Sequence, residues 1–430
     1  MNLLLSYNWI GFLSICVIIV LIRISVKSFF PIRILSIIDS ATVGFILFFA
    51  STILGYSSHI VIENWEYVLL ICIAYFFFIL GAIFARRIMG KRSDFDKQLS
   101  PGNFLTAFAM IFCIIWISYL LFHFIRLGSF SQAYRTFFGG TAHFQYVTDI
   151  GINADSIKSQ DFGTLINKFF TNIFYCCWFI IFIKRPKLAI SMWLFYVVFG
   201  LATYTSRTTL LSQVAIPFFA YIVVFHPRPR FLFFQVMIAS IVVVILFSWY
   251  SAVRIGRGFK ASPETVVKTT MFDIGSSGIY ATNILASSSI LRGDPINYLT
   301  NMVVFIIPRS LWEDKPYENY NYWMTIQLTG HSIGVGNSVL TTTMLGEAWY
   351  YFGVSGTIWL MLIFGFYSYF LEWFLTRHYY TFGVFIQMTI LAFIQIRSTF
   401  LTFFQVGIIA IISVSIFVLL VNVFIKKKVR

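Results

Sequence analysis

Uninterrupted apolar stretches of about twenty residues recur along the chain and constrain its fold more than any other feature. A stretch of this length crosses the hydrocarbon core of a bilayer as an α-helix. Hydrophobic residues fill 59% of the 430 positions and charged residues only 11%, whereas soluble domains carry about 25% charge. This balance excludes a soluble enzyme, a disordered chain and a disulfide scaffold. The sequence therefore predicts an all-α, polytopic integral membrane protein.

About eleven segments have the length and hydropathy of a transmembrane helix. No internal repeat and no separate soluble domain is visible, so we expect residues 1–430 to form a single transmembrane domain. The expected spans are residues 3–22, 32–56, 65–84, 103–125, 165–183, 188–204, 209–225, 231–252, 353–375, 381–396 and 401–425.

The positive charges predict the orientation of these spans. The formal net charge is +15, and more than half of the 31 Lys and Arg residues fall in short loops on one side of the predicted membrane. Cytoplasmic loops carry such an excess, so the N-terminus is expected outside and the C-terminus in the cytoplasm. The charge is then a topology signal, and we expect no nucleic acid as a partner.

Two long segments lie on the outer side of this topology, residues 126–163 and 254–351. The second is too long for a connector and should contain helices and a functional site of its own. Within it, apolar residues recur at helical spacing, which predicts a short amphipathic helix on the membrane surface. These residues are Ile296, Leu299, Val303 and Ile306.

Several cations lie at the outer boundary, against the usual bias. Arg254, Arg257 and Lys260 are spaced three residues apart and would form one row on a helix. Arg207 and Arg397 each lie between two closely spaced apolar segments. Guanidinium groups grip phosphate oxygens in a bidentate fork, so these cations suit a diphosphate at the membrane surface. The alternative is that they only snorkel to lipid headgroups.

The stretch IIPRSLWEDKPYENYNYW in the long outer segment combines bases, carboxylates and aromatic rings. Bases bind anions, while aromatic faces and carboxylates are suited to sugar rings. An aromatic belt at the membrane interface would explain the rings, but not the paired charges. The candidate residues are Arg309, Trp312, Glu313, Lys315, Tyr320 and Trp323.

Two further residues are candidates for proton transfer. Glu347 lies just before an expected span, where an apolar environment raises a carboxyl pKa and makes it a general base for a sugar hydroxyl. Equally, it is a candidate structural partner for one of the arginines. His331 shares the outer segment with Arg309. The histidines and cysteines lack metal-ligand spacing and no nucleotide motif occurs, so neither a metal nor a cofactor is expected.

Two short strings carry a resemblance to a known family. The string PR..W..KP comprises Pro308, Arg309, Trp312, Lys315 and Pro316, and the string GEAWYYFGVSG runs over residues 346–356. Together with the plan of ten to twelve spans and the large late outer loop, they resemble the Wzy-type O-antigen polymerases. The paired Arg and His motifs of some members, each with a Gly at a fixed offset, are absent here.

The resemblance implies a GT-C-like, metal-independent glycosyltransferase in the bacterial inner membrane. Its substrate would be an undecaprenyl-diphosphate-linked oligosaccharide, used at the periplasmic face. Arg309, Glu347 and His331 would be catalytic, the boundary cations and Lys315 would hold the diphosphate, and the aromatic stretch would hold sugar. Membrane lipids, a chain-length regulator and a flippase are the implied partners.

Three alternatives remain open at the level of sequence. An O-antigen ligase has a similar plan and the same donor. A lipid-linked oligosaccharide flippase performs no chemistry, but such transporters show repeated halves with short loops. A polyprenyl-phosphate sugar transferase would use a carboxylate in the first outer loop, where Glu63 and Glu66 lie.

Overall fold

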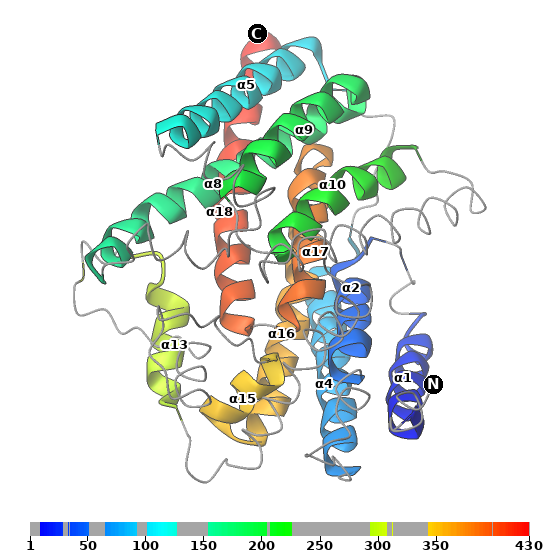
Figure 1. Cartoon of the computed structure of the whole chain (residues 1–430). Coiled ribbons are helices and arrows are strands. Elements are labelled where there is room, and N and C mark those ends of the chain that lie inside the picture. The colour runs from blue at the N-terminus through cyan, green and yellow to red at the C-terminus, as the bar shows by residue number, and fades with distance from the viewer. Residues whose placement is uncertain are drawn as a thin grey trace, which may run out of the picture. The chain divides into compact units, whose positions relative to one another are not determined.

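The chain is helical throughout the residues that its computed structural model describes, and no strand occurs among them (Figure 1). The described residues are 9–28, 33, 35–50, 65–92, 101–126, 154–203, 207–225, 293–307, 312, 343–397 and 399–429. The helices are α1 (Trp9–Ser25), α2 (Ile37–Gly44), the π-helix η1 (Phe45–Ala50), α4 (Trp65–Met89), α5 (Asn103–Arg126), α8 (Ala154–Lys184), α9 (Pro186–Thr203), α10 (Arg207–Phe225), α13 (Pro295–Val304), α15 (Met344–Phe352), α16 (Ser355–Leu375), the 3-10 helix η3 (Tyr379–Thr381), α17 (Phe382–Gln395) and α18 (Phe400–Val429).

The helices agree with the predicted apolar segments. Each predicted segment contains a helix except 231–252, which lies outside the described residues. Five helices are long and apolar enough to cross a membrane, which is compatible with a membrane protein. They are Val68–Met89, Asn103–Phe122, Leu165–Lys184, Ser355–Leu375 and Phe400–Val423. Helix α8 begins at Ala154, so it includes the end of the outer segment predicted at 126–163.

The chain divides into two compact units. The first comprises Met1–Lys91, Thr269–Trp373 and Leu391–Gly407, and the second comprises Arg92–Lys268, Phe374–Ile390 and Ile408–Arg430. Each contains at least one candidate membrane-spanning helix. The single transmembrane domain over residues 1–430 stays a prediction.

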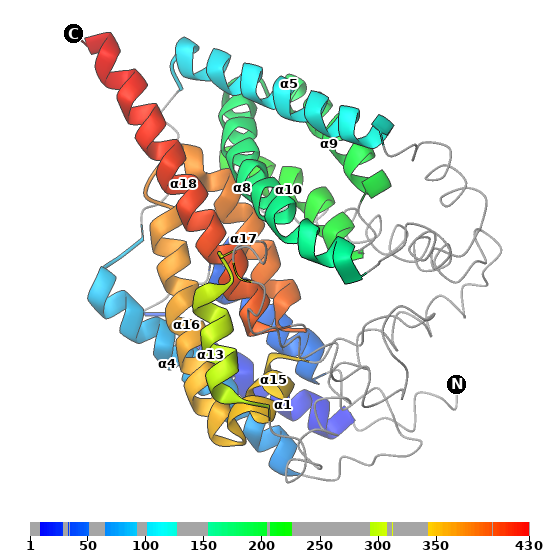
Figure 2. The ribbon, with the colours of Figure 1, turned by 90° about the vertical axis from the view of Figure 1, so that its left-hand side faces the viewer.

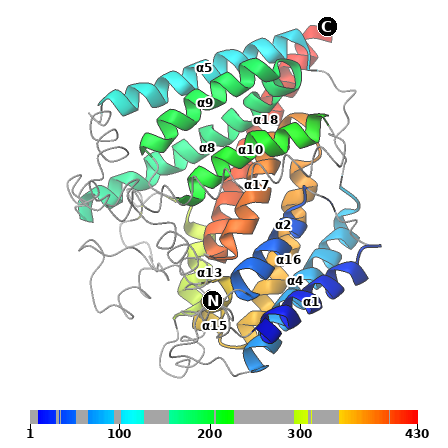
Figure 3. The same cartoon turned by 45° about the vertical axis from the view of Figure 1, so that its right-hand side comes forward.

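In the first unit, glycines bring helices α4 and α16 into close contact (Figure 3). A Cβ atom at Gly81 would lie 2.0 Å from the carbonyl oxygen of Leu362, and one at Gly365 would lie 1.8 Å from that of Phe78. The two backbones meet where each helix lacks a side chain. This is how helices gain packing energy in a bilayer, where apolar burial alone gives no preference for a neighbouring helix over lipid.

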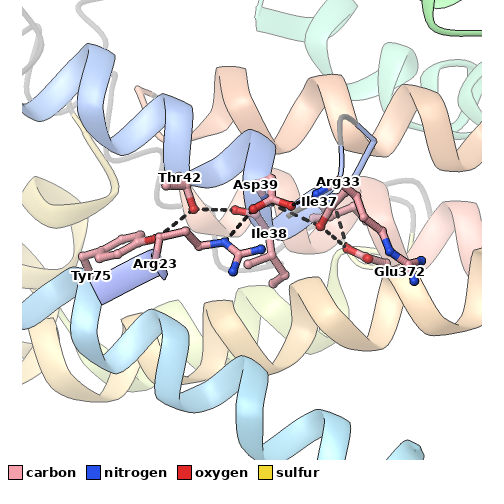
Figure 4. A network of polar contacts seen from close by, with 9 residues as sticks. Arg23, Arg33, Ile37, Ile38, Asp39, Thr42, Tyr75 and Glu372 are labelled. Carbon is pink, nitrogen blue, oxygen red and sulfur yellow. Dashed lines mark hydrogen bonds and ion pairs between the residues drawn. The ribbon is translucent and has the colours of Figure 1, made fainter. Parts of the chain in front are cut away.

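A buried polar network fixes the start of α2 in the same unit (Figure 4). The Glu372 carboxylate, on α16, accepts hydrogen bonds from the hydroxyl of Ser36 and the backbone N–H of Ile37, both at 2.9 Å. Asp39 forms an ion pair with Arg23 at 2.6 Å, with both side chains largely buried. Each charge in these contacts therefore has a partner, as burial requires.

The second unit contains α5, α8, α9 and α10, which follow one another in contact (Figure 2). Helix α8 is its core, and the Trp178 indole on it donates to the carbonyl of Ala189 at 2.8 Å. Trp193 donates to the carbonyl of Gln213 at 2.9 Å. Both indoles are buried and both N–H groups are satisfied.

We expect Gly365→Ala to destabilise the protein, because the added methyl group would overlap the Phe78 carbonyl on α4. Overpacking of this kind typically costs about 1–3 kcal/mol. Thermal unfolding in detergent would measure the loss. Gly102→Ala is the matched control, since a Cβ atom there meets nothing within 4 Å. Equal melting temperatures for the two variants would contradict the close helix contact.

Candidate functional site

The GEAWYYFG string forms a short, buried helix and the turn that follows it. Helix α15 begins after Thr343, whose hydroxyl accepts the backbone N–H of Gly346, and every residue from Met344 to Tyr351 is buried. It ends at Gly353, where φ is 66°, a conformation that favours glycine. A Cβ atom at Gly356 would lie 2.3 Å from the carbonyl of Ala348. The turn therefore sets α15 tightly against the start of α16.

Glu347 lies on α15 with its side chain directed at the N-terminus of α18. It is 1% exposed, and its carboxylate accepts the backbone N–H of Phe400 and, at 3.5 Å, that of Leu401. The backbone N–H of Met344 also donates to the carbonyl of Ile396, at 3.2 Å. The free N–H groups and positive dipole end of a helix favour a carboxylate there. Glu347 therefore has a structural role as a cap of α18.

Burial raises the pKa of Glu347 to about 8. Desolvation of the charged form is the main cause, and it outweighs the opposing effects of the Phe400 and Leu401 N–H groups and of the Tyr298 hydroxyl. The group is therefore largely protonated at neutral pH, with a small ionised fraction. A carboxyl group in this range can exchange a proton with a bound hydroxyl. The general-base role of Glu347 stays a prediction.

Helix α13 covers this region and has two different faces. Tyr298 and Asn301 are buried, and the Tyr298 ring packs on Tyr351 of α15 with centroids 4.5 Å apart. The backbone N–H of Gly293 donates to the carbonyl of Tyr350 at 3.0 Å. Sequence reasoning missed Tyr298 and Asn301. Their burial could have been inferred from the helical spacing, because both residues lie on the side of α13 opposite the apolar row.

The apolar row itself is exposed. Ile296, Leu299 and Val303 have exposed fractions of 73%, 51% and 76%. Ile306, just beyond the end of the helix, is also exposed. The amphipathic helix predicted here is confirmed as a helix, and its position on a membrane surface stays a prediction.

Of the predicted cations, Arg397 lies in the connection after α17 that contacts α15. Its neighbour Ile396 accepts a hydrogen bond from the backbone N–H of Met344, the first residue of α15. Trp312 is 38% exposed, and Arg207 is the first residue of α10. The remaining predicted site residues lie outside the described part of the chain. These are Arg254, Arg257, Lys260, Arg309, Glu313, Lys315, Tyr320, Trp323 and His331.

Within the described residues, no group of three His, Cys, Asp or Glu side chains is arranged to hold a metal ion. Comparisons with protein families, curated proteins and solved structures find no match for the chain.

We expect the stability of the protein to fall as the pH rises from about 5 to about 9. The pKa of Glu347 is raised in the folded state. Its contribution to the free energy of unfolding is therefore fully present below pH 4.5, the ordinary pKa of a Glu side chain, and is lost as the pH rises through about 8. The loss amounts to roughly 4 kcal/mol over this interval. Thermal unfolding of the wild type and Glu347→Gln at several pH values would measure it. Parallel curves for the two proteins would contradict the raised pKa.

We also expect the apolar row of α13 to contact lipid. In a background with the native cysteines replaced by alanine, Val303→Cys and Asn297→Cys would each carry an environment-sensitive fluorophore in lipid nanodiscs. Asn297 is the control, because it is exposed on the same helix outside the apolar row. The label at position 303 should emit at shorter wavelength and be quenched by lipid-borne quenchers, unlike that at 297. A water-like signal from both would rule out the membrane contact.

Proposed function

We propose that the protein is an O-antigen polymerase, or the polymerase of a related surface polysaccharide, in the bacterial inner membrane. In this proposal about eleven helices cross the membrane in a GT-C-like arrangement. The N-terminus is periplasmic, the C-terminus is cytoplasmic, and the active site faces the periplasm. The resemblance of the two short strings and the five helices of membrane-spanning length support it.

The proposed reaction moves a growing glycan from undecaprenyl diphosphate to the non-reducing end of a lipid-linked repeat unit. A hydroxyl oxygen of the acceptor attacks the anomeric carbon of the glycan and forms the new C–O bond. The bond from that carbon to the diphosphate breaks, and the diphosphate leaves with the electron pair. The acceptor proton passes to Glu347. The bond to the diphosphate supplies the driving force, so no cofactor is needed.

The observation that carries the proposal is the Glu347 carboxyl. Its pKa of about 8 leaves roughly a tenth of it ionised at pH 7, and makes that fraction a stronger base than an ordinary carboxylate. Because the group is only 1% exposed, the acceptor reaches it only after α13 or another covering element moves. Many active sites close and open around their substrates in this way.

The cations have a separate role in the proposal. Negative charge develops on the leaving diphosphate, and arginine side chains would stabilise it in place of a metal ion. Arg397 is the described candidate, and Arg309, Arg254 and Arg257 are the candidates from the sequence. Trp312, half-exposed, remains a candidate for a sugar ring.

Deletion of this gene alone from its bacterial host, with plasmid complementation, tests the proposal. A lipopolysaccharide gel should then show lipid A core carrying a single repeat unit, because export and ligation continue without polymerisation. Complete loss of O-antigen would instead favour the ligase or the flippase. Lipid-linked glycan that accumulates in the periplasmic leaflet would indicate a ligase. Lipid-linked glycan that accumulates in the cytoplasmic leaflet would indicate a flippase.

Variants on the complementing plasmid would test the two catalytic roles. Glu347→Gln should reduce polymer formation by about 10²-fold or more, since it removes the general base while keeping the shape of the side chain. Arg309→Lys should also reduce it sharply, because lysine keeps the charge but loses the bidentate fork. Arg185→Lys is the control, because it makes the same conservative change at an exposed arginine between α8 and α9, and it should leave polymer formation unchanged. A full polymer ladder from a well-expressed Glu347→Gln protein would remove Glu347 from the reaction.

A further inference from the structure

Two polar side chains on helix α13 are buried without a hydrogen-bond partner among the described residues. Tyr298 is 1% exposed and Asn301 is 6% exposed. The hydroxyl oxygen of Tyr298 and the amide nitrogen of Asn301 make no hydrogen bond of standard geometry there. A buried polar atom without a partner costs free energy, so two of them on one short helix need an explanation.

Both side chains lie on the side of α13 that packs on α15 (Figures 1 and 2). They are three residues apart and so share one face of the helix, opposite the exposed apolar row. The Tyr298 ring packs on Tyr351, with centroids 4.5 Å apart. Tyr351 lies four residues after Glu347, on the same side of α15. The unpaired atoms therefore lie at the contact between α13 and the side of α15 that carries the carboxyl.

The contact between α13 and α15 is tight at one end. The backbone N–H of Gly293, just before α13, donates to the carbonyl of Tyr350 at 3.0 Å, and a Cβ atom at Gly293 would lie 2.2 Å from the Tyr350 ring. Tyr298 and Asn301 lie about one and two turns further on. If the middle of α13 separates from α15, both side chains gain hydrogen bonds to water or a ligand. The unpaired atoms therefore lower the free energy that this opening requires.

The chemistry of this contact fits a neutral group with several hydroxyls. The Asn301 nitrogen donates, whereas the Tyr298 hydroxyl donates or accepts, so the partner needs both kinds of group. Neither α13 nor α15 contains a Lys or Arg, so the two helices offer an anion no charge to pair with. The rings of Tyr298, Tyr351 and Phe352 add apolar faces. A sugar ring matches both features, because it has hydroxyls at its edge and C–H groups on its faces.

We propose that the side of α13 that packs on α15 binds a neutral, hydroxyl-rich sugar ring, with Tyr298 and Asn301 as its hydrogen-bond partners once the middle of α13 moves away from α15. That this sugar belongs to the glycan acceptor rests on the proposed function, in which the acceptor hydroxyl meets Glu347. The binding face itself does not depend on polymerisation.

Thermal unfolding of the full chain in detergent, without ligand, is the first test. Tyr298→Phe and Asn301→Leu each remove an unpaired buried atom and nearly keep the side-chain volume, so each should raise the melting temperature by about 1–3 °C. Asn297→Leu is the matched control, because it makes the same change at an exposed position of α13 and shares any gain in helix propensity. A lower melting temperature for the buried variants would show that their polar atoms are bonded inside the fold, and would overturn the inference.

Binding of an oligosaccharide released by mild acid from the host's surface polysaccharide is the second test. Saturation-transfer NMR with the protein in lipid nanodiscs would give the dissociation constant. Each buried variant should bind about five- to tenfold more weakly, because it lacks one hydrogen bond, and Asn297→Leu should bind like the wild type. No binding by the wild type, or equal binding by the wild type and all three variants, would overturn the inference.

Deletion of the gene separates this inference from the proposed function. If the buried variants bind the oligosaccharide weakly but the deletion removes all O-antigen, the binding face stands and the polymerase assignment fails. If the deletion leaves one repeat unit on lipid A core but every variant binds like the wild type, the polymerase assignment stands and the binding face fails.

Discussion

Buried carboxyl groups at helix N-termini connect distant parts of the first unit. Glu372 holds the start of α2 and Glu347 holds the start of α18, and each is almost fully buried. In both cases the carboxyl group belongs to a residue far away in the sequence. A helix begins with unsatisfied N–H groups, and in an apolar interior they must find an acceptor within the protein. These contacts therefore fix which parts of the chain lie together.

The position of Glu347 follows from close packing around α16. Gly365 allows α16 to contact the backbone of α4, and Gly356 allows α15 to return against the start of α16. Larger side chains at these positions would separate the elements. The Glu347 carboxyl thus reaches the first turn of α18 because Gly365 and Gly356 allow α16 to lie close to α4 and to α15. Rigid placement of this kind is what the proton-transfer role proposed for Glu347 requires.

The same burial that makes Glu347 a structural cap gives it an altered chemistry. Full desolvation raises its pKa to about 8, while the helix N-terminus opposes the rise without cancelling it. A stability role and a proton-transfer role are therefore compatible at this residue. Helix α13 adds a further element, since one face packs on α15 and the other leaves apolar side chains exposed.

The sequence by itself determined the helical class, the positions of the long apolar helices and the amphipathic helix at 295–304, and it predicted an apolar environment for Glu347. These follow from hydropathy and local spacing, which act over a few turns of the chain. Only the tertiary structure decided that Glu347 contacts Phe400 and Leu401, and that Tyr298 of α13 stacks on Tyr351. It also showed Glu372 as the cap of α2. The physical reason is that each of these contacts joins residues dozens to hundreds of positions apart, and no local pattern encodes which buried donor a buried carboxylate will meet.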